Sequence, residues 1–158
     1  MRHLHSFMAV VLLALAALIV PASADDIPKL TITSPSGTVT YDRNQLEAMG
    51  LTSIKTATPW NKGVVNFEGV PIAALLDKAN AHGKTATVTA LNDYSVDIPV
   101  ADFAQYGVIL ALKRDGQYMP VADQGPFFVM YPFDANADLR RQPFYGRAVW
   151  QVHAITIQ

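Results

Sequence analysis

The sequence predicts a β-rich α+β domain in which mixed sheets are accompanied by a few short helices. Three observations support this fold class. Short segments that alternate between apolar and polar residues, as half-buried strands do, recur along the chain. Turn-forming pairs such as Asn92-Asp93 and Asp115-Gly116 separate several of these segments. Strand and helix signals follow one another in an irregular order, which favours an α+β arrangement over a regular βαβ alternation.

The amino terminus has the pattern of a signal peptide. Arg2 precedes an apolar run over residues 7–20, and small residues up to Ala24 follow it. This order of basic, apolar and small residues predicts cleavage after Ala24. The apolar run is shorter than the ~20 residues of a typical transmembrane helix. We therefore expect residues 1–24 to be a signal peptide, residues 25–158 to form one domain, and the mature protein to act outside the cytoplasm.

The first half of the expected domain carries two helix signals between strands. Asp42 and Gln45 have the spacing of a capping box, and Gly50 is a plausible end for the helix that they begin. Pro71 suits a first helical position, and apolar residues at positions 72, 75, 76 and 79 form one stripe of a second helix. Strands are expected over residues 29–33, 38–41, 51–58 and 64–67.

The second half is dominated by strands. Threonine and apolar residues alternate over residues 85–91, and the turn at Asn92-Asp93 leads into a return strand over residues 94–98. The continuous apolar run over residues 127–131 predicts a buried strand, whereas residues 132–146 have turn and polar composition. A third short helix and the remaining strands are expected over residues 101–106, 108–112, 117–121 and 149–157.

Charge and cysteine content exclude several classes of function. The chain has 12 basic and 13 acidic residues and a net charge of −1, so it is not expected to bind nucleic acid. It contains no cysteine, which excludes disulfides, thiolate metal ligands and a cysteine nucleophile. Phosphate-binding glycine loops and a G-x-S-x-G nucleophile elbow are absent from the sequence. His82 and His153 lie on different predicted elements, so a zinc site is not expected.

Several loop segments carry candidate binding residues. Threonines beside Trp60 could bound a polar pocket with an aromatic floor, and an amide and a carboxylate stand at the Asn92-Asp93 turn. The pair Arg140-Arg141 suits an anion or a carbonyl oxygen. Each feature also has a plain structural explanation: a tryptophan covering the core edge, turn geometry, and a solvated face on which arginines pair with nearby aspartates.

Taken in order, these segments resemble the oxidoreductase molybdopterin-binding domain, which has the sulfite oxidase fold. The resemblance is carried by the Trp60 loop and by five further segments: Phe67-Glu68-Gly69-Val70-Pro71-Ile72, Asn92-Asp93-Tyr94 with Ile98-Pro99, Val108 to Val121, Gly125-Pro126 to Pro132, and Tyr145-Gly146-Arg147 with Trp150. It implies a sulfite-oxidase-type fold over nearly all of the mature chain.

The chain departs from the catalytic pattern of that family in two ways. Catalytic members ligate molybdenum through a cysteine a few residues before a tryptophan, and here that position holds Thr56. A threonine hydroxyl is not a soft, readily ionised ligand. The closing segment also lacks the family's phosphate-binding lysines, and only Arg147 is nearby. The resemblance is closest to small periplasmic pterin-binding regulators that lack the cysteine and act on the periplasmic domain of a membrane-bound GGDEF/EAL diguanylate cyclase/phosphodiesterase.

We therefore expect a non-catalytic periplasmic protein that binds a pterin, in reduced form, and reports it to such a membrane-anchored sensor. Aromatic residues would stack on the ring, and polar side chains would pair with its edge. Two alternatives stay open: a molybdopterin-dependent oxidoreductase with a non-cysteine metal ligand, and a ligand-free interaction protein. The residues expected near the pterin are Thr56, Trp60, Asn92, Asp93, Tyr94, Tyr131, Asp134, Arg140, Arg141 and Tyr145.

Overall fold

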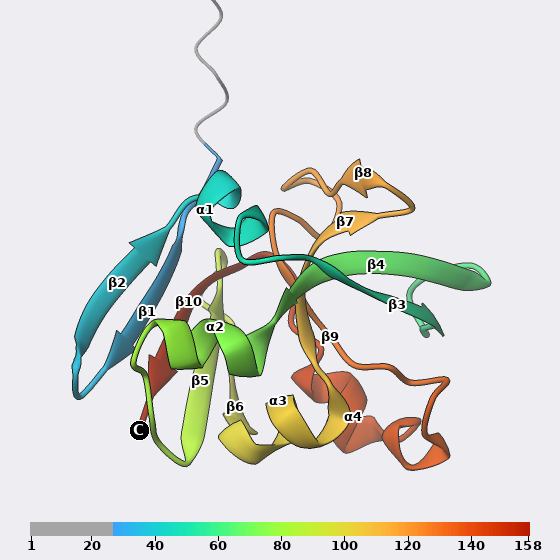
Figure 1. Cartoon of the computed structure of the whole chain (residues 1–158). Helices are drawn as coiled ribbons and strands as arrows, with labels where there is room; N and C mark the ends of the chain where they lie inside the picture. Colours follow the sequence, from blue (N-terminus) through green and yellow to red (C-terminus); the bar gives the residue numbers. More distant parts are fainter. Residues whose placement is uncertain (1–26) are drawn as a thin grey trace, which may run out of the picture.

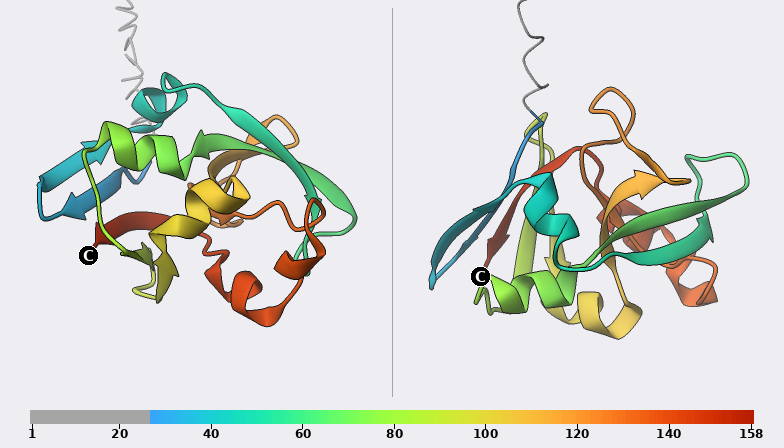
Figure 2. Two further views of the ribbon diagram at one scale, coloured as in Figure 1. Left: turned by 60° about the horizontal axis from the view of Figure 1, so that its bottom comes forward. Right: turned by 45° about the horizontal axis from the view of Figure 1, so that its top comes forward.

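Two β-sheets form the framework of the computed structural model, which describes residues 27–158 (Figure 1). The expected signal peptide, residues 1–24, lies outside the described residues. Figure 2 shows the β1–β2 hairpin and the β3–β4 ribbon at opposite ends of the molecule. Within residues 27–158, none of the helices has the length and apolar character needed to cross a membrane.

The first sheet is mixed and has the order β2-β1-β10-β5-β6. Its central pair, β1 with β10, is parallel, and its other neighbours are antiparallel. Alternate residues of β1 and β5 point into the core, and threonines cover much of the opposite face. The strands are β1 (Leu30–Ser34), β2 (Gly37–Tyr41), β5 (Thr85–Ala90), β6 (Ser95–Pro99) and β10 (Val152–Ile157).

The second sheet is antiparallel, with the order β3-β4-β7-β8 and with β9 paired to β7. The apolar run over residues 127–131 is fully buried and contains β9, as the sequence predicts. Together the two sheets confirm the predicted β-rich α+β class. The strands are β3 (Thr52–Ala57), β4 (Val64–Pro71), β7 (Ile109–Arg114), β8 (Gln117–Tyr118) and β9 (Phe128–Met130).

Strand β4 continues to Pro71, four residues beyond its predicted end, and a β-bulge makes this possible. The register with β7 shifts between Glu68 and Gly69. At the bulge the backbone of Gly69 lies so close to β7 that an added Cβ would be 2.1 Å from the carbonyl oxygen of Leu110. Glycine therefore permits this close approach, and Pro71 becomes the last strand residue and the cap of the next helix.

Short helices connect the strands. Asp42 and Gln45 form the predicted capping box at the start of α1 (Arg43–Glu47), with both backbone-to-side-chain hydrogen bonds present. Helices α2 (Ile72–Lys78) and α3 (Val100–Tyr106) pack against each other. All three lie where the sequence predicts helices.

The prediction of residues 132–146 as irregular was wrong in part. This segment contains the 3₁₀ helix η1 (Ala137–Leu139) and most of α4 (Gln142–Arg147). The side chain of Asn136 caps η1 by accepting a hydrogen bond from the Asp138 amide at 2.9 Å. A proline in the first turn, Pro143, favours the start of α4, and this signal lay within a segment whose composition otherwise resembles a loop.

Candidate functional site

A cavity of about 400 Å³ opens between the β5–β6 turn, the loop after β3, and α4 with the segment that follows it. Its volume falls within the ~300–1,000 Å³ typical of small-molecule sites. The contact between α4 and β6 brings two of these walls together although they are far apart in the sequence. The lining residues are Pro59, Trp60, Ala90, Asn92, Tyr94, Gln142, Tyr145, Gly146, Ala148, Val149 and Trp150.

Aromatic rings form the apolar part of the cavity wall, with Trp60 at their centre. The Trp60 ring centroid lies 5.7 Å from that of Trp150 and 6.0 Å from that of Tyr145, both in edge-to-face geometry. Behind it, Phe128 and Phe133 lie at 6.0 and 6.3 Å and connect the cluster to the core. Such packing holds the Trp60 ring in place, and it presents π-surfaces on which a flat ligand can stack.

The loop that carries Trp60 is fixed by Thr58, one of the threonines beside Trp60 that the sequence suggested as the boundary of a polar pocket. The Thr58 hydroxyl accepts hydrogen bonds from the amides of Trp60, at 3.3 Å, and Asn61, at 3.1 Å. It donates to the Asn61 side chain at 2.9 Å. Because every polar atom of the hydroxyl is used within the loop, Thr58 supports Trp60 without facing a ligand.

Two carboxamide side chains, from different elements, line the cavity. Asn92 stands at the β5–β6 turn, where its side-chain oxygen accepts a hydrogen bond from the Tyr94 amide at 3.2 Å. This bond orients the Asn92 carboxamide, whose amino group is a donor. Gln142 begins α4 and also lines the cavity. Gln142 is not among the predicted site residues, because the sequence around it has the composition of a loop and does not predict α4.

Trp60, Asn92, Tyr94 and Tyr145 are therefore the predicted site residues that line the cavity. The turn also exposes Tyr94, which is 55% solvent-accessible. Asp93 occupies the turn itself with a φ of 65° and is exposed outside the cavity lining. Its left-handed backbone agrees with the structural explanation of this residue as a turn former.

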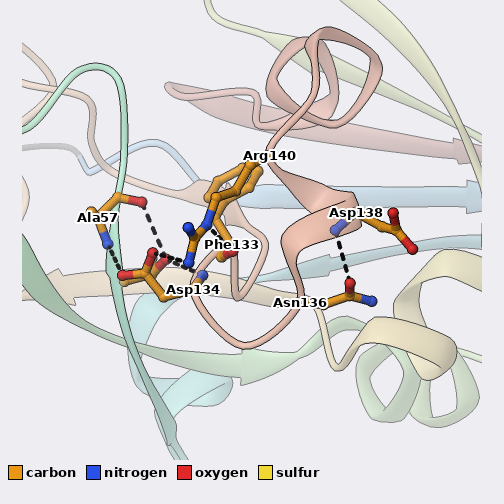
Figure 3. A network of polar contacts seen from close by, with 7 residues as sticks. Ala57, Phe133, Asp134, Asn136, Asp138 and Arg140 are labelled. Carbon is orange, nitrogen blue, oxygen red and sulfur yellow. Dashed lines mark hydrogen bonds and ion pairs between the residues drawn. The ribbon is translucent and has the colours of Figure 1, made fainter.

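Thr56, Asp134 and Arg140 lie together in a network that joins the loop after β9 to β3 (Figure 3). Thr56 is fully buried, and its hydroxyl accepts from the Asp134 amide at 3.1 Å and donates to the Ala57 carbonyl at 3.2 Å. The Asp134 carboxylate accepts from the Ala57 amide at 2.7 Å and pairs with Arg140 at 3.2 Å. None of these three predicted residues lines the cavity.

The neighbouring arginine, Arg141, also lies outside the cavity lining. It is exposed, and its Nε donates to the Asp138 carbonyl at 2.9 Å. Arg140 uses its own Nε in the same way, donating to the Phe133 carbonyl at 3.0 Å. Both arginines therefore stabilise the turns around η1. This role is close to the structural explanation that the sequence offered, a solvated face on which arginines pair with nearby aspartates.

Tyr131 belongs to a buried polar cluster that joins β9 to α3 and α4. Its hydroxyl donates to Oδ2 of Asp102 at 2.9 Å, and Arg147 donates to the same oxygen at 2.7 Å. Both Tyr131 and Asp102 are buried. Desolvation by burial raises the pKa of Tyr131 well above its usual value, and the charge of Asp102 raises it further. Arg147, the cation nearest the closing segment, is thus engaged by Asp102.

Tyr131→Phe is expected to make the protein less sensitive to alkaline pH. Above pH ~10 the phenol ionises in the unfolded chain but keeps its proton in the folded protein, so the stability it contributes is lost as pH rises. At pH 7 the free energy of unfolding of the wild type is expected to exceed that of the variant by about 1 kcal/mol, because the variant lacks the hydrogen bond of the hydroxyl. Urea unfolding at pH 7 and pH 11 measures this difference, and a difference that grows with pH would contradict the expectation.

Comparison with known proteins identifies a family model and a similar fold. The model described as "Oxidoreductase molybdopterin binding domain" matches residues 22–133. Among solved structures, the sulfane dehydrogenase SoxCD from Paracoccus pantotrophus superposes with a TM-score of 0.63 at 15% identity. That match covers 82% of this chain but only 38% of the enzyme chain. No curated protein matches the chain in sequence.

Proposed function

Because the chain belongs to the oxidoreductase molybdopterin-binding domain family and has a fold of the sulfite oxidase type, we propose that it is a non-catalytic pterin-binding protein of the periplasm. The observation that carries this proposal is the cavity in which aromatic rings and two carboxamides converge. The pterin is proposed to bind in its reduced form. The signal-peptide pattern of residues 1–24 supports the location.

The cavity lining has the chemistry that a pterin requires. A pterin is a flat heterocycle whose edge carries both hydrogen-bond donors and acceptors. Trp60, Tyr145 and Trp150 offer ring surfaces for stacking. Asn92 and Gln142 each carry one acceptor oxygen and one amino group, so either can pair with such an edge. The open, partly polar cavity also favours a ligand over the alternative of a ligand-free interaction protein.

The residues present do not fit the molybdenum of catalytic family members. The chain contains no cysteine, and Thr56 stands where the resemblance implies the thiolate ligand. The Thr56 hydroxyl is fully buried and already makes two hydrogen bonds. In the part of the chain that the structure describes, no three histidine or carboxylate side chains are grouped to hold a metal ion. This donor set supports a binding role in preference to the alternative of a molybdenum oxidoreductase.

Apolar residues beside the cavity support the proposed regulatory role. Leu91, Tyr94 and Trp150 are 38%, 55% and 37% exposed, and the last two also line the cavity. A bound pterin would touch side chains that also form the outer surface, so a partner contacting this surface could sense the ligand. We propose that the partner is the periplasmic domain of a membrane-anchored GGDEF/EAL diguanylate cyclase/phosphodiesterase.

Calorimetric titration of the chain over residues 25–158 with dihydroneopterin, a reduced pterin, tests ligand binding. We expect saturable binding at one site with a Kd in the micromolar range or below, about −8 kcal/mol or stronger. The control is the same titration with an uncharged flat compound that lacks the donor and acceptor edge, such as naphthalene methanol. Absence of heat at high micromolar pterin would contradict the proposal, as would equal binding of both compounds.

The regulatory role has a separate test. The candidate membrane enzyme is assayed for cyclic-di-GMP synthesis and hydrolysis in membranes, with the protein alone, with pterin alone, and with both together. The proposal expects a change of activity that requires protein and pterin together. If the enzyme's activities stay the same in all three mixtures, this enzyme is not the partner. That result would leave pterin binding, which calorimetry tests separately, unaffected.

A further inference from the structure

The cavity is lined by neutral residues only. Across residues 27–158, its lining includes no lysine, arginine, histidine, aspartate or glutamate. Its polar groups are carboxamides, tyrosine hydroxyls, indole N–H groups and the backbone. Such groups can hydrogen-bond a neutral heterocycle, but they carry no formal charge to balance an ionised ligand.

The arginines in α4 and directly before it are engaged elsewhere. Arg147 on α4 pairs with Asp102 at 2.7 Å, and Arg140 pairs with Asp134 at 3.2 Å. Arg141 donates to the Asp138 carbonyl, and its guanidinium lies 6.0 Å from the Phe144 ring centroid. Lys62 follows Trp60 by two residues but is exposed and does not line the cavity. Moving an arginine to a ligand would therefore leave a carboxylate or a carbonyl without its partner.

Molybdopterin, the cofactor for which the family is named, carries a phosphate group. A phosphate monoester has a charge of about −1.5 to −2 at pH 7. Placing that charge against an aromatic wall without a cation has an unfavourable desolvation free energy, and the net negative charge of the chain does not offset it. The cavity therefore fits the pterin ring of the cofactor and does not fit its phosphate.

We propose that the cavity selects unphosphorylated pterins and discriminates against phosphorylated ones, molybdopterin included. This inference rests on the proposed function, since it concerns the ligand of the same site. The selectivity comes from the neutral lining together with two ion pairs, Arg147–Asp102 and Arg140–Asp134. These pairs keep the nearby cations away from the ligand.

Competitive titration with dihydroneopterin and dihydroneopterin monophosphate tests the selectivity, because the two compounds differ only in the phosphate. We expect the monophosphate to bind at least about tenfold more weakly. Equal or tighter binding of the monophosphate would overturn the inference and leave the proposed pterin binding intact. Failure of both compounds to bind would overturn the proposed function and the inference with it.

A charge-introducing variant sharpens the test. Pro59 is an exposed lining residue at the cavity rim, so a lysine there places a cation beside the ligand without refilling the core. Pro59→Lys is expected to raise the affinity for the monophosphate about tenfold relative to the matched neutral variant Pro59→Gln, with the ratio of the two ligand affinities as the readout. An unchanged ratio in Pro59→Lys would contradict electrostatic discrimination. Circular dichroism confirms that both variants are folded.

Discussion

Gly69→Ala is expected to lower the free energy of unfolding by more than about 3 kcal/mol. The added methyl group would lie 2.1 Å from the carbonyl oxygen of Leu110 and 2.5 Å from the Cα of Ala111. Both atoms belong to the backbone of β7, which is held in the sheet by β4 on one side and by β9 on the other. No side-chain rotation relieves this overlap, so the bulge must open and the two strands must separate.

Urea unfolding followed by circular dichroism measures the effect. The matched control is Gly146→Ala, at a helical position in α4 where an added Cβ meets nothing within 4 Å. That substitution is expected to leave stability unchanged or to increase it by up to about 1 kcal/mol. If Gly69→Ala unfolded at the same urea concentration as the control, the close approach of β4 and β7 would not be present in solution.

Trp60→Ala is expected to weaken binding of dihydroneopterin by at least about 100-fold, equivalent to ~2.7 kcal/mol. The substitution removes a stacking surface and also the ring against which Tyr145 and Trp150 pack, so both remaining walls lose their support. We also expect a loss of unfolding free energy of about 2–3 kcal/mol, below that of a fully buried tryptophan because Trp60 is partly exposed.

Two control variants separate binding from stability in the calorimetric titration. Trp60→Phe keeps an aromatic ring in the cluster and is expected to retain binding within about tenfold. Tyr118→Ala removes an aromatic residue that is 43% exposed on β8, outside the cavity lining, and is expected to leave affinity unchanged. If Trp60→Ala folded and bound the pterin like the wild type, the cavity would not be the pterin site.

The sequence predicts those parts of the fold that depend on local signals. The Asp42–Gln45 capping box, the Asn92-Asp93 turn and the buried run over residues 127–131 are each determined within a few residues, and each is confirmed. The extension of β4 could not be predicted, because it depends on a backbone contact between Gly69 and a strand about 40 residues later in the chain. Helix α4 was missed because turn-like residues surround its one start signal.

The candidate site could likewise be predicted only in part from the sequence. Trp60 and Tyr145 can be selected from the sequence as aromatic residues in segments of loop-like composition, and tertiary packing brings them to one cavity. Thr56 and Asp134 have equally suggestive residue types, but they are 78 positions apart in the sequence and satisfy each other's polar groups across the fold. Nothing local distinguishes a threonine that faces a ligand from one that bonds a distant backbone amide.

Strand β10 is the central strand of the first sheet, between β1 and β5, although it follows all the other strands along the chain. The earlier hairpins β1–β2 and β5–β6 therefore cannot join into one sheet until β10 is present. Contacts between such distant parts of a chain slow folding, so we expect the first sheet to form only after residues 152–157 have been synthesised. Deleting β10 would therefore divide the sheet into two hairpins rather than shorten its edge.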